Sequence, residues 1–163
     1  LTLVGSTKIT LKSSPGPINT SYPHIRVDRH GQHFADIWTD IEFTSLSASR
    51  AGKSPLTLGD YHEMDIAVLR PSASARPLPT EVLLAVECKN TGYQKSLLRE
   101  TLGVRRELSM LRNPTPTAFT NWPRAIVPAD PPSCIAVYSS DSAVLNYNGP
   151  GAFFGIDFFH QPL

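Results

Sequence analysis

The sequence has few cysteines, no long apolar run and almost no surplus charge. Its two cysteines, Cys88 and Cys134, both lie in apolar stretches. Two thiols make neither a disulfide framework nor a CxxC zinc pattern, so we expect reduced core thiols in a reducing, cytoplasmic location. No segment reaches the roughly 18 apolar residues that a membrane-spanning helix needs, so we expect no membrane partner.

Several motifs of common enzymes are missing as well. The chain contains no Walker loop, no GxGxxG and no HExxH, and the residues after the strand predicted at 133–138 lack the Gly-x-Ser-x-Gly pattern of serine hydrolases. The formal net charge of +1 excludes a global polycation. Any binding of nucleic acid would therefore depend on a local basic surface.

The length of 163 residues, with 15 prolines and 10 glycines, fits one domain with many turns. We expect a core at residues 34–141 and an N-terminal arm at 1–33. Residues 6–11 could be a strand or part of the arm, 13–23 read as a loop, and 24–28 could begin a strand. His24, His30 and His33 match no strong metal motif, and we predict that they lie on the surface.

The hydrophobic pattern predicts three strands, a helix and a returning strand. The strands are expected at 34–46, 61–69, 81–89 and 133–138, with a polar turn region at 47–59 and an amphipathic helix at 94–112. Residues 115–132 are proline-rich loop, and 152–159 are either a strand or a short aromatic helix. Strict alternation would place Ile37, Ile41 and Phe43 on one face, and Met64, Ile66 and Val68 on one face. This order favours an α/β fold with a mixed sheet flanked by helices.

The end of the strand at 81–89 carries the chemically informative residues. Glu87 and Lys89 flank Cys88 after a run of small apolar residues, and positions i and i+2 share a face of a strand. Asp65 interrupts the apolar pattern of the preceding strand. If these two strands pair as a hairpin, Asp65 and Glu87 meet, and a divalent cation would relieve their repulsion. Carboxylate oxygens select a hard ion such as Mg²⁺ or Mn²⁺.

Asp65, followed after 21 residues by Glu87-Cys88-Lys89, resembles the signature of the PD-(D/E)XK (restriction-endonuclease-like) nuclease superfamily. The resemblance covers residues 61–138, and Met64 stands where the family often has proline. The family's first helix, which frequently supplies a glutamate, has no counterpart before residue 34, so Glu42 or Glu63 would substitute. Because the chain begins at Leu1 rather than at Met, we expect a trimmed or processed chain, and that helix could lie in the removed part.

The resemblance implies a Mg²⁺-dependent endodeoxyribonuclease in which Asp65, Glu87 and Lys89 are catalytic. Asp65, Glu87 and the backbone carbonyl of Cys88 would hold Mg²⁺ or Mn²⁺, with Glu63 and Glu42 as further candidate ligands. The ion would polarise the scissile phosphate, and Lys89 would orient the attacking water. Cations on the following helix would contact DNA phosphates, namely Lys95, Arg99 and Arg106. Such a domain would serve restriction, defence, recombination or repair, as a homodimer or in a larger nuclease complex.

Two alternatives stay open at this point. Glu87 and Lys89 could form an ion pair at the surface end of a strand, with Asp65 as a turn residue. The fold could also be a catalytically inactive nuclease-like domain that binds nucleic acid or scaffolds a larger complex. Action on RNA is a weaker variant of the first hypothesis, because no aromatic platform for single strands is evident.

Overall fold

The computed structural model describes residues 7–12, 24–71, 73–110 and 129–162. Within them, seven strands form one mixed sheet in the order in which they occur along the chain. The strands are β1 (Thr7–Lys12), β2 (His24–Arg29), β3 (Gln32–Thr44), β4 (Tyr61–Leu69), β5 (Val82–Lys89), β6 (Cys134–Ser139) and β7 (Ile156–His160).

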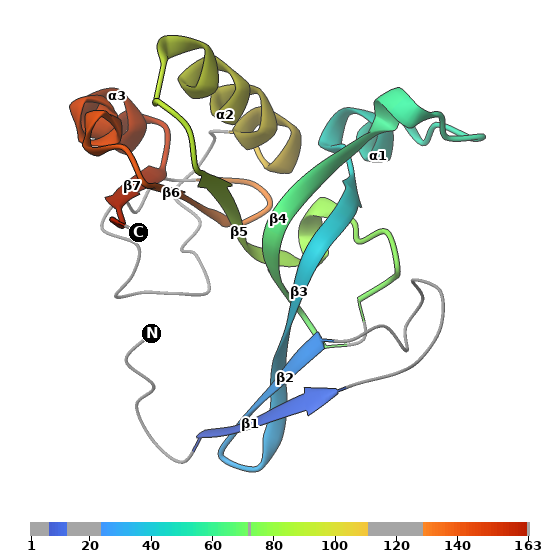
Figure 1. Cartoon of the computed structure of the whole chain (residues 1–163). Helices are drawn as coiled ribbons and strands as arrows, with labels where there is room; N and C mark the ends of the chain where they lie inside the picture. Colours follow the sequence, from blue (N-terminus) through green and yellow to red (C-terminus); the bar gives the residue numbers. More distant parts are fainter. Residues whose placement is uncertain (1–6, 13–23, 72, 111–128, 163) are drawn as a thin grey trace.

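The sheet combines an antiparallel and a parallel half. Strands β1 to β5 pair with their neighbours antiparallel, whereas β5, β6 and β7 run parallel to one another. Parallel strands need crossover connections, and the helices supply them. Helix α2 (Lys95–Leu108) joins β5 to β6, and the 3₁₀ helix η3 (Ser142–Tyr147) with helix α3 (Asn148–Phe153) joins β6 to β7. Figure 1 shows α2 and α3 above the parallel half, while the β1–β2–β3 end of the sheet extends away from them.

The strands predicted around the candidate site are confirmed. Strand β4 has the predicted bounds, β5 begins one residue later than predicted, and β6 is shifted by one residue at both ends. Helix α2 ends at Leu108, earlier than predicted, because Met110 leaves the helix and exchanges backbone hydrogen bonds with Asp130. Residues 152–159 hold both of the alternatives considered, the end of α3 and most of β7. Most of the loop predicted at 115–132 lies outside the described residues.

The prediction of a turn region at 47–59 is wrong at its start, where helix α1 (Leu46–Ala51) forms. Ser45 caps this helix by accepting a hydrogen bond from the Ala48 backbone N–H (3.2 Å), and Gly52 ends it in the left-handed conformation (φ 60°). The buried Leu46 and Ala48 side chains fix the helix to the core. Two further 3₁₀ turns, η1 (Leu58–Asp60) and η2 (Pro79–Glu81), precede β4 and β5.

The strict alternation predicted for β3 and β4 is also wrong. Ile41, Phe43 and Met64 belong to the same buried cluster as Ala67, although Met64 and Ala67 differ in parity along β4. Ile37 and Ile66 pack against the other cluster. The break lies at Asp40, whose left-handed backbone (φ 51°) is uncommon for a residue inside a strand.

The same irregularity involves Asp65. The ladder between β3 and β4 passes from the pair Thr39–Ile66 to the pair Ile41–Met64, and Asp40 and Asp65 are left between them. Asp65 therefore occupies a point where the regular sheet is interrupted. Interruptions of this kind occur next to active sites, where they re-aim a side chain.

The part expected to be an N-terminal arm contributes two strands to the sheet. His24 on β2 stacks on Trp38 of β3, with ring centroids 4.4 Å apart, and its Nε2 lies 3.4 Å from Asp36 Oδ1. The His33 Nε2 lies 2.9 Å from the same oxygen. The prediction of a surface position is therefore confirmed for His30, which is exposed, but not for His24 and His33, which are both half-buried.

Candidate active site

Strands β4 and β5 bring the predicted residues Asp65, Glu87 and Lys89 together. The antiparallel pairing of the two strands is confirmed, and it extends as far as Ile66 and Val86. Continuing this register by one residue would set Asp65 opposite Glu87. Here the Asp65 carboxylate takes over from the ladder, because its Oδ2 accepts a hydrogen bond from the Cys88 backbone N–H at 2.6 Å.

That hydrogen bond also orients the backbone of Cys88. The N–H and C=O groups of one strand residue point toward the same neighbouring strand. Since the Cys88 N–H points toward Asp65, its carbonyl faces β4 as well. The backbone N–H and C=O groups of Lys89 point the opposite way, toward β6. The Lys89 carbonyl there accepts a hydrogen bond from the Ser140 N–H (3.1 Å). The carbonyl predicted as a metal ligand therefore lies on the Asp65 side of β5.

Glu87 is a buried carboxylate, with only 7% of its surface exposed. Burial raises the pKa of Glu87 above its ordinary value, although the hydrogen bond and charge of Lys89 oppose the shift. The negative charges of Asp65 and Glu100 add to the increase in the pKa of Glu87. The negative charge of Glu87 is therefore only partly compensated. A nearby cation would favour the ionised form of this buried carboxylate.

Lys89 supplies the compensation that is present. Its Nζ lies 2.7 Å from Glu87 Oε2 and 3.8 Å from Glu100 Oε1 of helix α2. Partial burial acts to lower the pKa of Lys89, but the hydrogen bond and charge of Glu87 outweigh it and the pKa is raised. Lys89 is thus a protonated donor at neutral pH in this arrangement, which suits an orienting role better than that of a base.

The ion pair of the alternative interpretation does exist, but it is not a surface pair. Glu87 is buried, and the Lys89 side chain is 20% exposed. Asp65 lies within β4 rather than in a turn. A buried ion pair contributes little net stability, because desolvation offsets most of the attraction. Stability alone therefore gives little reason for this arrangement.

Glu100 is the site residue that the sequence reasoning missed. At about 100° per residue, Lys95, Arg99 and Arg106 fall within a stripe roughly 40° wide, whereas Glu100 lies about 100° away, on the side that faces Lys89. Only the crossing of α2 over β5 reveals this, although the spacing of eleven residues after Lys89 places Glu100 in the second turn of the helix.

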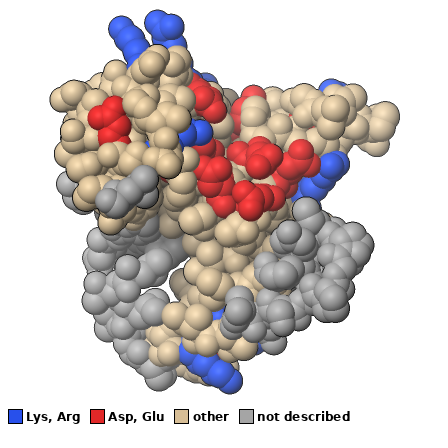
Figure 2. Space-filling model, viewed as in Figure 1, with Lys and Arg blue, Asp and Glu red and all other residues tan. Residues whose placement is uncertain are grey.

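The three cations predicted to bind DNA are exposed on α2. In Figure 2 acidic side chains gather at the centre of the face, while basic side chains protrude at the top, over the position of α2 in Figure 1. The structure thus separates a basic stripe on the helix from an acidic centre on the sheet.

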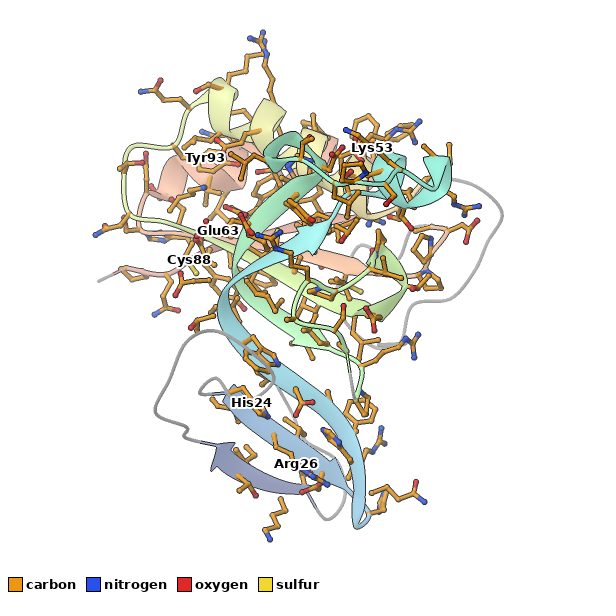
Figure 3. The ribbon with its side chains drawn as sticks, turned by 90° about the vertical axis from the view of Figure 1, so that its right-hand side faces the viewer. His24, Arg26, Lys53, Glu63, Cys88 and Tyr93 are labelled. Carbon is orange, nitrogen blue, oxygen red and sulfur yellow. The ribbon has the colours of Figure 1, made fainter. Side chains whose placement is uncertain are left out.

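Glu42 and Glu63 lie opposite each other on β3 and β4. Arg76 approaches Glu42 at 2.9 Å and lies over the Tyr61 ring, 4.0 Å from its centroid. Figure 3 labels Glu63 and Cys88 on the two neighbouring strands that also carry Asp65 and Glu87. Among the described residues, no group of three or more His, Cys, Asp or Glu side chains is arranged to hold a metal ion, so Glu42 and Glu63 do not complete a site of that size.

The donors that remain fit one hard cation. Asp65 and Glu87 offer carboxylate oxygens from facing strands, and Cys88 offers a carbonyl on the same side. Mg²⁺ is usually bound by one or two carboxylates and keeps several waters, which substrate phosphates can replace. Two carboxylates and a carbonyl match that requirement.

The loop after β5 is fastened to the end of β6. The Tyr93 N–H donates to Asp141 Oδ2 (2.7 Å), and the Ser140 hydroxyl donates to Asn90 Oδ1 (3.0 Å). Asp141 also caps η3 by accepting a hydrogen bond from the Ala143 N–H. The hydrogen bond from Ala143 and, to a lesser extent, that from Tyr93 lower the pKa of Asp141. Asp141 therefore has a structural part in fixing the segment between Lys89 and α2.

Comparisons with protein-family models, with curated proteins and with solved structures find no match to this chain. Among the residues that the structure describes, no helix is both long and apolar enough to cross a membrane.

Proposed function

We propose that the protein is a metal-dependent nuclease that hydrolyses phosphodiester bonds of DNA. The observation that carries the proposal is the meeting of Asp65 and Glu87 where β4 and β5 separate, with Lys89 bonded to Glu87. The order of elements supports it, because β4 with Asp65, β5 with Glu87 and Lys89, α2 and β6 follow one another as in the PD-(D/E)XK superfamily.

In this proposal, each residue has one task. Asp65 and Glu87 hold the cation, together with the carbonyl of Cys88, and the Asp65–Cys88 hydrogen bond fixes the distance between the two strands. Bound Mg²⁺ or Mn²⁺ would supply charge stabilisation at the scissile phosphate. Lys89, as a protonated donor, would hold the attacking water by hydrogen bonding and offset negative charge in the transition state.

The exposed stripe of Lys95, Arg99 and Arg106 is proposed to contact DNA phosphates. Each such contact makes the affinity for DNA depend on salt. The logarithm of the binding constant should fall linearly with the logarithm of the salt concentration, with a slope of about 0.9 per phosphate contacted. Cutting both strands of a duplex with one site per chain would require a second copy, so a homodimer or a larger nuclease complex is proposed with it.

A catalytically inactive nuclease-like domain is the second candidate. It is favoured by the pairing of Glu87 with Lys89 at 2.7 Å, which occupies one of the two proposed carboxylate ligands. Such a domain would bind DNA through the α2 stripe without cutting it.

Cleavage of plasmid and linear DNA separates the two candidates. The assay uses Mg²⁺, Mn²⁺ or EDTA, with Asp65→Ala and Lys89→Ala beside the wild type. The nuclease proposal predicts cleavage that requires the metal and disappears in both variants. DNA binding without cleavage under either ion would favour the inactive domain.

A further inference from the structure

Lys89 lies between two carboxylates that differ in burial. Glu87 is buried and bonded to the ammonium group at 2.7 Å, whereas Glu100 reaches it from helix α2 at 3.8 Å, and the Glu100 side chain is 59% exposed. Lys89 is therefore paired with Glu87 and has Glu100 within the range of an ion pair. If Glu87 turned to another cation, Lys89 would still have an anion beside it.

A second observation concerns Tyr93, at the start of the segment that leads into α2. The residue is 5% exposed, and within the described structure its hydroxyl is buried without a hydrogen-bond partner. The Thr101 hydroxyl is close enough to Tyr93 to lower the pKa of Tyr93, but it donates its own proton to the Leu97 carbonyl (2.9 Å). Burial first of all raises the pKa of Tyr93, the Thr101 hydroxyl opposes the increase, and the charges of Tyr147, Lys89 and Glu100 have smaller effects. Figure 3 shows Tyr93 between the strand that carries Cys88 and helix α2.

Buried polar groups without a partner are rare, and each one calls for an explanation. An ammonium group has three donors and needs several acceptors. Glu100 and the Tyr93 hydroxyl together could supply acceptors for Lys89 after it leaves Glu87. The unpartnered hydroxyl would then gain the hydrogen bond that it lacks.

We propose that Glu100 and Tyr93 are positioning residues that receive the Lys89 ammonium group when a divalent cation binds Glu87. The transfer frees the Glu87 carboxylate for the cation and keeps Lys89 paired and close to the scissile phosphate. The inference rests on the proposed metal site, and it assigns to Glu100 a contact with Lys89 rather than with the metal.

The test is a double-mutant cycle on Mg²⁺ affinity, measured from the rise in Tm on titration with the ion. The four proteins are the wild type, Glu100→Gln, Lys89→Met and the double variant. We expect Glu100→Gln to weaken Mg²⁺ binding by about fivefold, the size of an ion pair with one exposed partner, and by less than about twofold in the Lys89→Met background. Without metal, Glu100→Gln should leave the Tm unchanged, because Lys89 keeps Glu87.

If Glu100→Gln weakened Mg²⁺ binding equally with and without Lys89, Glu100 would act only through its charge, and the proposed transfer would be overturned. No weakening of Mg²⁺ binding in either background would overturn it as well.

Tyr93→Phe provides a second test, since it should reduce the rise in Tm caused by Mg²⁺ without lowering the Tm of the metal-free protein. The metal site is tested separately by Asp65→Asn and Glu87→Gln. If these abolish Mg²⁺ binding while Glu100→Gln has no effect, the proposed function stands and the transfer fails. A wild type that binds neither Mg²⁺ nor Mn²⁺ would overturn both.

Discussion

The carboxylate of Asp65 closes the gap between β4 and β5 by accepting the Cys88 backbone N–H at 2.6 Å. The bond joins the two strands that carry the proposed metal ligands, at the point where their regular pairing ends. It also explains how a carboxylate can occupy the middle of a strand in this sheet. The side chain replaces a backbone acceptor that the interrupted ladder no longer provides.

Asp65→Ala should therefore destabilise the fold as well as remove a proposed metal ligand. Loss of the acceptor leaves the Cys88 N–H without its partner, at a cost of about 1 kcal/mol in the free energy of unfolding for a partly exposed group. Asp65→Asn keeps an acceptor oxygen and should unfold close to the wild type. Urea unfolding of both variants measures the difference, and equal loss of stability in the two would contradict the role given to this hydrogen bond.

The pH dependence of stability should report the burial of Glu87. Its pKa in the folded protein is raised from the ordinary 4.5, so the folded state holds this proton more tightly than the unfolded state does. The stability that this provides is complete below about pH 4.5 and is lost as the pH rises through the folded pKa. Relative to Glu87→Gln, which stays neutral, the wild type should become progressively less stable as the pH increases above 4.5. Denaturant unfolding across pH 4–8 tests this, and a constant difference would refute it.

Asp60 should produce the opposite dependence at low pH. Hydrogen bonds from Lys53 and then from the Thr57 backbone and hydroxyl lower the pKa of Asp60 to about 2 from its ordinary 3.8. The stability from the ionised form is present above pH 3.8 and is lost as the pH falls toward 2. The advantage of the wild type over Asp60→Asn should shrink across that interval. An advantage that persisted unchanged at pH 2 would mean that the carboxylate does not hold this loop through its charge.

Two glycines of α3 offer a matched pair for core packing. A methyl group added at Gly151 would overlap the Phe158 ring and come within 3.0 Å of the Ile156 carbonyl, whereas one added at Gly149 meets nothing within 4 Å. Gly151→Ala should lower the free energy of unfolding by about 1–3 kcal/mol. Gly149→Ala should leave it unchanged or raise it slightly, because alanine favours a helix. Thermal unfolding of both variants tests this prediction. A neutral effect of Gly151→Ala would contradict the close contact between Gly151 and Phe158.

Much of the site could be predicted because it depends on short-range pattern. The spacing of Glu87 and Lys89 fixes that they share a side of β5, and the apolar run before them predicts the strand. The meeting of Asp65 with Glu87 needed one further assumption, the antiparallel pairing of β4 and β5, which the register confirms.

Other features depend on long-range geometry that no local pattern contains. The left-handed backbone of Asp40 shifts the alternation of β3 and overturned the predicted faces. The contact between Glu100 and Lys89 depends on how α2 crosses the sheet. Helix α1 was missed although Ser45 and Gly52 are ordinary helix-end residues, because six residues give too little periodicity to register.

The most direct test of the nuclease proposal compares two isosteric charge removals in one cleavage assay. The rate of plasmid cleavage is measured against Mg²⁺ concentration for the wild type, Glu87→Gln and Glu107→Gln. Glu107 lies on α2 rather than on β5, and it accepts a hydrogen bond from the Ser47 N–H (3.0 Å), which an amide oxygen can still accept. The proposal predicts that Glu87→Gln abolishes Mg²⁺-dependent cleavage while Glu107→Gln cleaves at the wild-type rate. Cleavage by Glu87→Gln at the wild-type rate, with the same dependence on Mg²⁺, would contradict it.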